Sequence, residues 1–384
     1  MLSRRHLLGA AALAVPTALV LPDLAQAAPG APATPEAWLE WLRGNRTKVG
    51  AHLDDGKGGV VRHRQDAAQP LASAMKVVHL AAYATAVAER RQDPKRCVRI
   101  ADWESYYLPN MDGGAHPAAL KHLKIPLDPS GLYAADPQRV VSLDDLALAM
   151  ITFSDNAATD YLAVLLGEPE LRRAAAVAGW ARADIRMISG EMLIALHGKD
   201  SGPPEAPLAG ASMDPEARKE TGSKLARRYA GDPKYREWVI TELYPKMPGF
   251  EGLAPWADRS WAAPARDLAK LHRALATGNY RPAPAAPLAR THLERSFGPN
   301  PRPGFEALGF KGGSLSGGIL TFGFGARRTD GTVSSGAILF RGLTLAEFSQ
   351  QRPLIDLVLN AAFDPAWQRR VAEALGTRPG ILGG

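Results

Sequence analysis

The segments that read as β-hairpins lie near the two ends of the 384-residue chain, and most of what lies between them reads as helix. Residues 48–64 contain two strand-like runs joined by a glycine-rich turn, and residues 319–340 contain two more, joined by the turn at 329–332. The chain is long enough for one large domain or two closely packed ones. A fold for it therefore has to combine strands from both ends with a long helical middle.

Apolar residues recur at helical spacing in the middle and at both ends of the chain. We predict helices at 35–42, 72–90, 142–153, 157–166, 264–277 and 354–375. Ser142, with Asp145 three residues later, forms a possible capping box for one of them. Residues 181–199 read as a loop. Residues 103–135 read as an irregular insertion, and residues 200–250 as a second insertion with one basic helix.

The composition is that of a globular protein, with 46% hydrophobic and 22% charged residues. Lys and Arg outnumber Asp and Glu by 46 to 39, but the excess is spread along the chain, so we expect no nucleic-acid partner. The single cysteine, Cys97, cannot form an internal disulfide, and we expect it to be partly buried and inert. Sequence patterns of zinc hydrolases and phosphate-binding loops are absent, so we predict no metal and no cofactor.

The first 27 residues read as an export signal. Arg4-Arg5 precedes an apolar run and is typical of a twin-arginine signal. An ordinary secretory signal is an open alternative, and an uncleaved anchor is disfavoured because the run at 7–21 is shorter than the about 20 residues of a membrane span. Residues 28–35 would form a linker, and the mature chain would lie in the periplasm or outside the cell, with no membrane span.

Ser73-x-x-Lys76 lies just after a short segment that contains Pro70 and just before the apolar run of a predicted helix. Residues three apart on a helix share a face, so the hydroxyl and the amine lie about one turn apart. An amine whose pKa is lowered can take the proton of a serine and make it a nucleophile. Taken alone, the pattern also fits a serine that caps a helix and a lysine in solvent.

Two further polar motifs follow in the chain. Ser154-Asp155-Asn156 lies at the junction of two apolar helices, where a simple cap and turn is the alternative interpretation. Lys311-Gly312-Gly313-Ser314 stands at the start of the strand-like C-terminal region.

These three motifs in this order resemble the active-site serine β-lactamases and penicillin-binding proteins, and most closely the class A β-lactamases. The resemblance implies an α+β fold: a five-stranded antiparallel sheet flanked by helices, an all-helical lobe, and an active site between them. It covers most of residues 36–380, apart from 103–135 and 200–250. The domain would span 36–384, with an α/β lobe at 36–70 and about 290–384. The helical lobe would be about 71–289, including both insertions.

The resemblance also implies roles for single residues. Ser73 would be the acylated nucleophile, Lys76 its base or proton relay, and Ser154 a proton shuttle to the leaving nitrogen or oxygen. Asn156 would hold the amide side chain of the substrate, and Lys311 would attract a carboxylate.

The rest of the third motif would contact the substrate as well. Gly313 and Ser314 would line it, and the main-chain N–H groups of Ser73 and Ser314 would form an oxyanion hole.

Two departures from the family pattern matter. Gly312 replaces the usual threonine or serine, which weakens the expected grip on a carboxylate. The second departure concerns the carboxylate that activates the deacylating water. Glu168-Pro169 matches the family motif but comes too soon after Ser154, and reads as a helix start. Glu191 lies at a more suitable distance and is the other candidate.

Three functions remain open from the sequence. The first is an exported serine hydrolase that acts on a β-lactam or a related amide or ester. The second is a D-alanyl-D-alanine carboxypeptidase or transpeptidase that acts on a peptidoglycan-like substrate. The third is a β-lactam or muropeptide binder that is acylated without turnover. We expect a monomer in each case.

Overall fold

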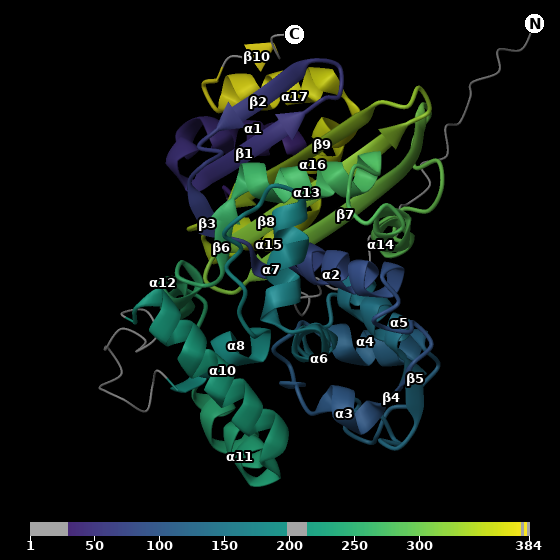
Figure 1. Ribbon diagram of the computed structural model, residues 1–384. Helices are drawn as coiled ribbons and strands as arrows, with labels where there is room; N and C mark the ends of the chain where they lie inside the picture. Colours follow the sequence, from purple (N-terminus) through teal and green to yellow (C-terminus); the bar gives the residue numbers. More distant parts are fainter. Residues whose placement is uncertain (1–29, 198–212, 378–379, 382–384) are drawn as a thin grey trace, which may run out of the picture.

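The computed structural model describes residues 30–197, 213–377 and 380–381. The predicted export signal at 1–27, the first two residues of the linker and part of the second insertion lie outside these ranges. In the described chain, the strands of the main sheet gather at one end and most helices at the other (Figure 1).

One antiparallel sheet joins the two ends of the chain. Its strand order is β10-β2-β1-β9-β8-β7. The strands are β1 (Val49–Asp54), β2 (Gly59–His63), β7 (Phe305–Leu315), β8 (Ile319–Arg328), β9 (Val333–Phe340) and β10 (Gly380–Ile381). The first hairpin meets the second where β1 pairs with β9, with Val49 opposite Phe340. The expected five-stranded sheet is confirmed, β10 adds a short sixth strand beside β2, and β7 is an edge strand.

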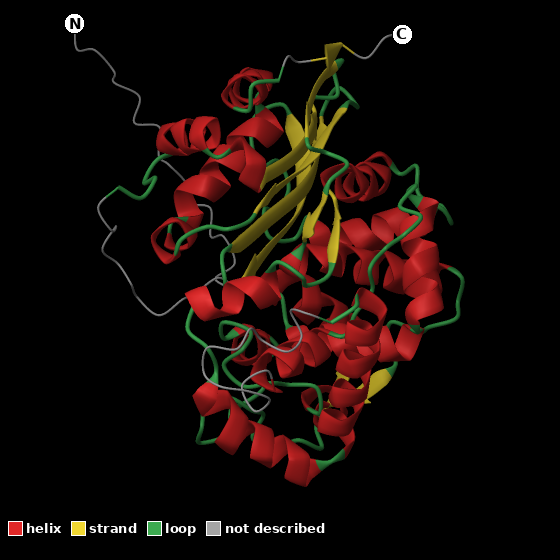
Figure 2. Ribbon diagram, turned by 90° about the vertical axis from the view of Figure 1, so that its left-hand side faces the viewer, coloured by secondary structure: helices red, strands yellow, loops and turns green. Residues whose placement is uncertain are grey.

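Helices cover both faces of this sheet (Figure 2). α13 (Ala265–Thr277) packs on β8 and β9 from one side, while α1 (Pro35–Gly44), α16 (Gln351–Phe363) and α17 (Pro365–Ala374) form the layer on the other. Because both faces are covered, every residue of β9 is buried.

The remaining helices are α2 (Lys76–Ala88), α3 (Ile100–Glu104), α4 (Ala115–His122), α5 (Leu143–Leu148), α6 (Asn156–Leu166), α7 (Glu168–Val177), α8 (Ile188–His197), α10 (Pro215–Gly231), α11 (Pro233–Trp238), α12 (Ala254–Ala257), α14 (Ala285–Leu293) and α15 (Leu345–Ser349). Short helical turns are η1 (Arg46–Lys48), η2 (Ala72–Met75), η3 (Ala149–Phe153), η4 (Val239–Leu243), η5 (Tyr244–Lys246) and η6 (Glu251–Leu253). Two small strand pairs join β3 (Ala68–Pro70) to β6 (Ala262–Pro264) and β4 (Cys97–Arg99) to β5 (Val140–Ser142). α2 is the central helix, and it is buried almost throughout because α6, α7 and α14 surround it.

Several local predictions are confirmed, among them the capping box. The Ser142 side chain accepts from the Asp145 N–H, and the Asp145 carboxylate accepts from the Ser142 N–H. The Glu168-Pro169 pair begins α7, as expected.

Four expectations are wrong. Residues 181–199 contain the helix α8, whose first turn is capped from a distance: the Asp160 carboxylate on α6 accepts from the N–H groups of Ile188 and Ser189. The helix expected at 354–375 is two helices, because Asp364 caps a new one. The described part of 200–250 holds α10 and α11 rather than a single helix. Cys97 is exposed.

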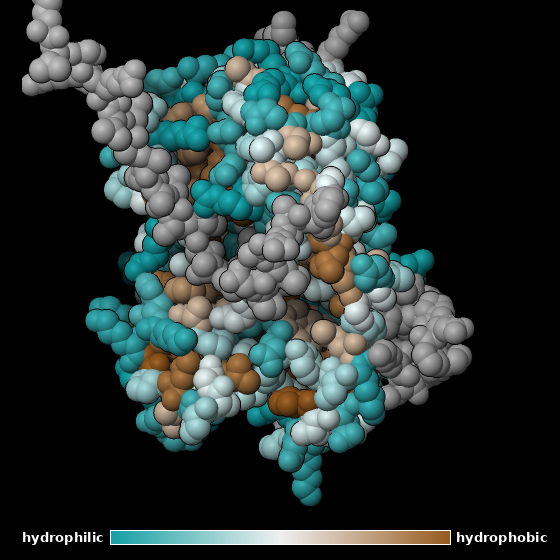
Figure 3. All heavy atoms as spheres, turned by 180° about the vertical axis from the view of Figure 1, so that it is seen from behind, coloured by the Kyte–Doolittle hydropathy of each residue, from teal (hydrophilic) through white to brown (hydrophobic). Residues whose placement is uncertain are grey.

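The surface of the described chain is mixed in character. Figure 3 shows a face on which hydrophilic residues predominate and hydrophobic residues form small separate patches. Within the described residues, we find no helix with both the length and the apolar character that crossing a membrane requires.

Candidate active site

Ser73 lies in η2, between β3 and α2, and lines a cavity of about 280 Å³ at the sheet edge. Two neighbours fix this turn through its carbonyl groups. Trp261 Nε1 donates to the Ala72 oxygen at 2.6 Å, and Thr321 Oγ1 on β8 donates to the Leu71 oxygen at 2.6 Å. Ala72 has a φ of 45°, a strained conformation for a residue with a Cβ. The surrounding contacts therefore hold Ser73 at the N-terminus of α2.

Lys76 is the first residue of α2, and its side chain is fully buried. Its Nζ donates to the Ser154 main-chain oxygen, to Ser154 Oγ at 3.1 Å and to Asn156 Oδ1 at 2.7 Å. Burial lowers the pKa of this amine to about 7, although the Asp155 carboxylate opposes the shift. Near neutral pH a large fraction of Lys76 is therefore uncharged and able to accept a proton.

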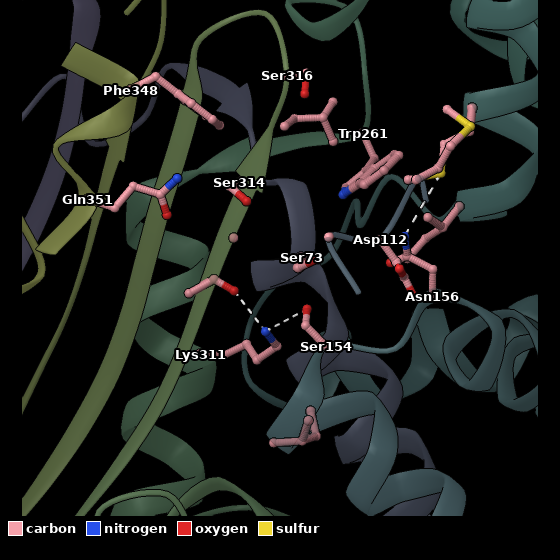
Figure 4. Close-up of a pocket in the computed structure, with 18 of the residues that line it drawn as sticks. Ser73, Asp112, Ser154, Asn156, Trp261, Lys311, Ser314, Ser316, Phe348 and Gln351 are labelled. Atoms are coloured by element: carbon pink, nitrogen blue, oxygen red, sulfur yellow. Dashed lines mark hydrogen bonds between the residues drawn. The ribbon is translucent and has the colours of Figure 1, made fainter. Parts of the chain in front are cut away.

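Lys311 reaches the same hydroxyl from the sheet. Its Nζ donates to Ser154 Oγ at 3.0 Å and to the Gly312 oxygen at 2.8 Å (Figure 4). Burial, and then the nearby charge of Lys76, hold the pKa of Lys311 well below its usual range. Lys311 lies in the second half of β7. The sequence pattern predicted the start of a strand here, and that prediction is wrong. Two buried amines thus converge on one serine oxygen.

A buried ionic network contacts the turn that carries Ser154 through the next residue, Asp155. Asp155 caps α6 by accepting from the Ala158 N–H, and it also accepts from His116 Nδ1 at 2.8 Å. His116 Nε2 lies 3.3 Å from Glu104 Oε1. Burial opposes the charge of His116, but Asp155 and Glu104 outweigh it and raise the pKa of His116 to about 9. The irregular insertion at 103–135 is therefore tied directly to the second motif.

Gly313 allows β7 to approach the nucleophile closely. A Cβ at this position would lie 2.6 Å from the Ser73 nitrogen and 2.7 Å from the Ala74 nitrogen. Only a residue without a side chain can occupy it, and Ser314, the next residue, is thereby brought to the cavity beside Ser73. Gly312 is different, because a Cβ there would make ordinary contacts of 3.5 Å with Phe310 and Phe322. Packing therefore does not explain why Gly312 lacks a side chain.

The structure brings together seven of the eight residues expected at the site. Six of them line the cavity, namely Ser73, Ser154, Asn156, Lys311, Gly313 and Ser314, and Lys76 is bonded to two of these. The only carboxylate among the described lining residues is Asp112, which the sequence analysis did not single out. Its oxygens accept from the N–H groups of Gly114 and His116, so it also shapes its own loop.

Glu191 is the one candidate that the structure sets apart. It is 1% exposed and lies in α8, but it does not line the cavity. One carboxylate oxygen accepts from Arg186 Nη1 at 2.7 Å, and the other accepts from Arg218 Nε at 2.8 Å. Both oxygens are thus engaged in ion pairs.

Met192, the residue after Glu191, does face the cavity. Its sulfur lies 3.9 Å from Asn156 Nδ2. Glu168, the other acidic candidate, forms ion pairs with Arg172 and Lys219 and is also absent from the cavity lining. The side of α8 that meets the second motif therefore presents a thioether.

Sequence reasoning missed Trp261, Met192 and His116 as parts of the site. No local motif marks them, since each contacts the site from a segment far away in the chain. His116 lies in the irregular insertion at 103–135, where the sequence favoured a surface or packing position.

The fold is an antiparallel sheet with a helical lobe, and two buried lysines, Lys76 and Lys311, meet at Ser154. A model of the β-lactamase enzyme family matches residues 39–296, which is more than half of the chain. The protein belongs to this family and is a serine hydrolase. A search of curated proteins gives no match.

Solved structures of similar proteins agree on the fold. A β-lactamase from Sphaerobacter thermophilus is 17% identical, with a TM-score of 0.51, and the match covers 89% of this chain and 98% of that one. A β-lactamase from Chitinophaga pinensis is 13% identical, with a TM-score of 0.52 and coverage of 86% and 99%. A class A β-lactamase from Mycobacterium abscessus is 14% identical, with a TM-score of 0.51 and coverage of 89% and 100%.

Proposed function

We propose that the protein is an exported hydrolase that opens a β-lactam, or cleaves a related amide or ester, through an acyl-enzyme on Ser73. The observation that carries this proposal is the convergence of Lys76 and Lys311 on Ser154 Oγ, in a cavity that Ser73 also lines. Two buried amines with lowered pKa values are costly to a fold and are typical of sites that move protons.

Acylation would follow from this geometry. The neutral amine of Lys76 takes the proton of Ser73 as the Ser73 oxygen bonds to the carbonyl carbon of the substrate. The N–H groups of Ser73 and Ser314 would stabilise the oxyanion, which the contact of Gly313 with η2 supports. As the bond from carbon to the leaving nitrogen or oxygen breaks, the proton passes by way of Ser154 to the leaving atom. Asn156 and Lys311 would orient the substrate.

A second function has one specific observation in its favour. The cavity-facing residue of α8 is Met192, and both oxygens of Glu191 are held by arginines. With no carboxylate of α8 at hand to activate water, release of the acyl group would be slow. This favours a D-alanyl-D-alanine carboxypeptidase or transpeptidase, or a protein that binds a β-lactam or muropeptide covalently and keeps it.

Export is proposed from the sequence, since residues 1–27 lie outside the described chain. The arginine pair and the apolar run support delivery to the periplasm or the outside of the cell. Cell fractionation of the full-length chain, compared with a variant in which Arg4-Arg5 is Lys-Lys, tests this: the substituted chain should stay in the cytoplasm.

The chemistry is tested by intact-mass measurement after mixing the protein with a chromogenic cephalosporin. We expect an adduct on Ser73 in the wild type and none in Ser73→Ala. Decay of the adduct within seconds identifies a β-lactamase, whereas persistence for many minutes identifies the slow alternative. Absence of any adduct in the folded wild type would reject both.

A further inference from the structure

The cavity continues past the edge strand, away from the nucleophile. Side chains alternate along a strand, so Lys311 and Gly313 face Ser73 while Phe310 and Gly312 face the opposite side. On that opposite side the cavity is lined by Phe297, Phe310, Gly312, Phe348, Gln351 and Ile355, which we call the aromatic arm. Figure 4 shows Phe348 and Gln351 approaching β7 from the side away from Trp261 and Asp112.

The aromatic arm is apolar, and its side chains are largely buried. The rings of Phe297 and Phe310 meet edge to face with centroids 5.7 Å apart, and Phe348 and Ile355 are each 3% exposed. A group of the substrate placed there would leave water and contact aromatic carbon. An apolar group gains from this transfer, and a charged group loses unless a counter-charge is present.

A counter-charge is missing from the described lining of the cavity. Its only cationic side chain is Lys311, which faces the other side of β7 and is bonded to Ser154 and the Gly312 oxygen. No arginine lines the described cavity. A carboxylate in the aromatic arm would therefore be buried without an ionic partner.

Gln351 supplies the polar feature of the aromatic arm. It is 8% exposed, and its Oε1 has no hydrogen-bond partner among the described residues. A buried acceptor without a donor is unfavourable, so a substrate that brings an N–H or O–H group there would be stabilised. An amide can pair a neutral polar group, but it cannot neutralise a charge.

We propose that the aromatic arm selects substrates whose group beside Gly312 is uncharged and largely apolar, so that neutral β-lactams and esters acylate Ser73 in preference to their carboxylate forms. This inference rests on the acyl-enzyme function proposed above. The bonds made and broken at Ser73 are the same for both substrate forms, and only the group held by the aromatic arm differs.

A chromogenic cephalosporin and its own methyl ester provide a matched pair, because they differ only in whether one carboxyl group is a charged carboxylate or a neutral methyl ester. Acylation of the wild type is followed by rapid quenching and intact mass, with Ser73→Ala as the blank. We expect the methyl ester to react at least about tenfold faster, which corresponds to about 1.4 kcal/mol. Equal rates, or a faster free acid, would overturn the inference and leave the acyl-enzyme intact. Failure of both probes would overturn the proposed function itself.

A charge-installing variant then tests the role of Gln351. In Gln351→Lys, we expect the ratio of free-acid to methyl-ester acylation to rise at least about tenfold, because an ammonium group now faces the arm. Arg352→Gln alters the charge of the exposed neighbour on the same helix and should leave the ratio unchanged. An unchanged ratio in folded Gln351→Lys would contradict the proposal. If that variant does not fold, the wild-type ratio decides.

Discussion

Two of the buried clusters of charged side chains near the second motif differ in how their charge is balanced. In the amine cluster, Lys76 and Lys311 donate to the neutral acceptors of Ser154, Asn156 and Gly312. In the carboxylate cluster, Glu191 is held between two arginines.

Buried amines without an ionic partner lose their protons easily, and this prepares them for proton transfer. A buried carboxylate whose two oxygens are both engaged by guanidinium groups serves the fold instead. Burial alone therefore does not distinguish a catalytic ionisable group from a structural one. The distinguishing feature is that the catalytic group has no ion-pair partner.

The largest effect is expected from removing the Lys76 amine, which is bonded to Ser154 and Asn156. Lys76→Met keeps the length of the side chain but removes the base, so acylation of Ser73 should fall by about a thousandfold, within the usual range for a lost general base. Stability should be unchanged or higher, because a buried amine is replaced by an apolar chain. Intact mass and urea unfolding measure the two effects. A large loss of stability with normal acylation would contradict this prediction, because Lys76 would then serve the fold and not the reaction.

Breaking the carboxylate cluster should have the opposite outcome. Glu191→Gln leaves the buried charges of Arg186 and Arg218 without their common partner, and the free energy of unfolding should fall by about 3 kcal/mol. The acylation rate of the folded protein should not change. Glu220→Gln, which opens the exposed pair with Lys224, is the matched control and should leave the unfolding midpoint where it is.

The same variant also addresses the earlier alternative for Glu191. If the Ser73 adduct accumulates in folded Glu191→Gln while the wild type releases it, then Glu191 activates the deacylating water. The ion pairs of Glu191 with Arg186 and Arg218 would then serve catalysis, and the distinction between a catalytic and a structural cluster would fail.

A smaller effect is expected at the residue between the two clusters. Met192→Glu places a carboxylate at the cavity wall beside Asn156, where it can activate water, and adduct decay should accelerate about tenfold. Met192→Gln has a similar size without a base and should decay at the wild-type rate. Equal decay in the two variants would show that position 192 does not control release.

Local signals predicted much of the fold. The hairpins, the capping box at Ser142 and the start of α7 all depend on neighbours in sequence, and each is present in the structure. The helix α8 was missed because its cap comes from Asp160, 28 residues before Ile188. Long-range capping leaves no local pattern.

The site shows the same limit. The three motifs could be found from the sequence because the residues of each lie within four consecutive positions. The engagement of Glu191 by Arg186 and Arg218, and the assembly of the aromatic arm from several distant segments, depend on tertiary packing. Periodicity and motif spacing carry no information on such contacts.

The pH dependence of Ser73 acylation tests the central claim most directly, because the mechanism requires Lys76 to be neutral near pH 7. Burial lowers the pKa of Lys76 from its ordinary 10.5 to about 7, and only the deprotonated amine accepts a proton. The acylation rate, measured by rapid quenching and intact mass, should rise from acidic pH and level off above about pH 7. A rate independent of pH, or one that keeps rising until the midpoint nears 10.5, would contradict the assignment of Lys76 as the base.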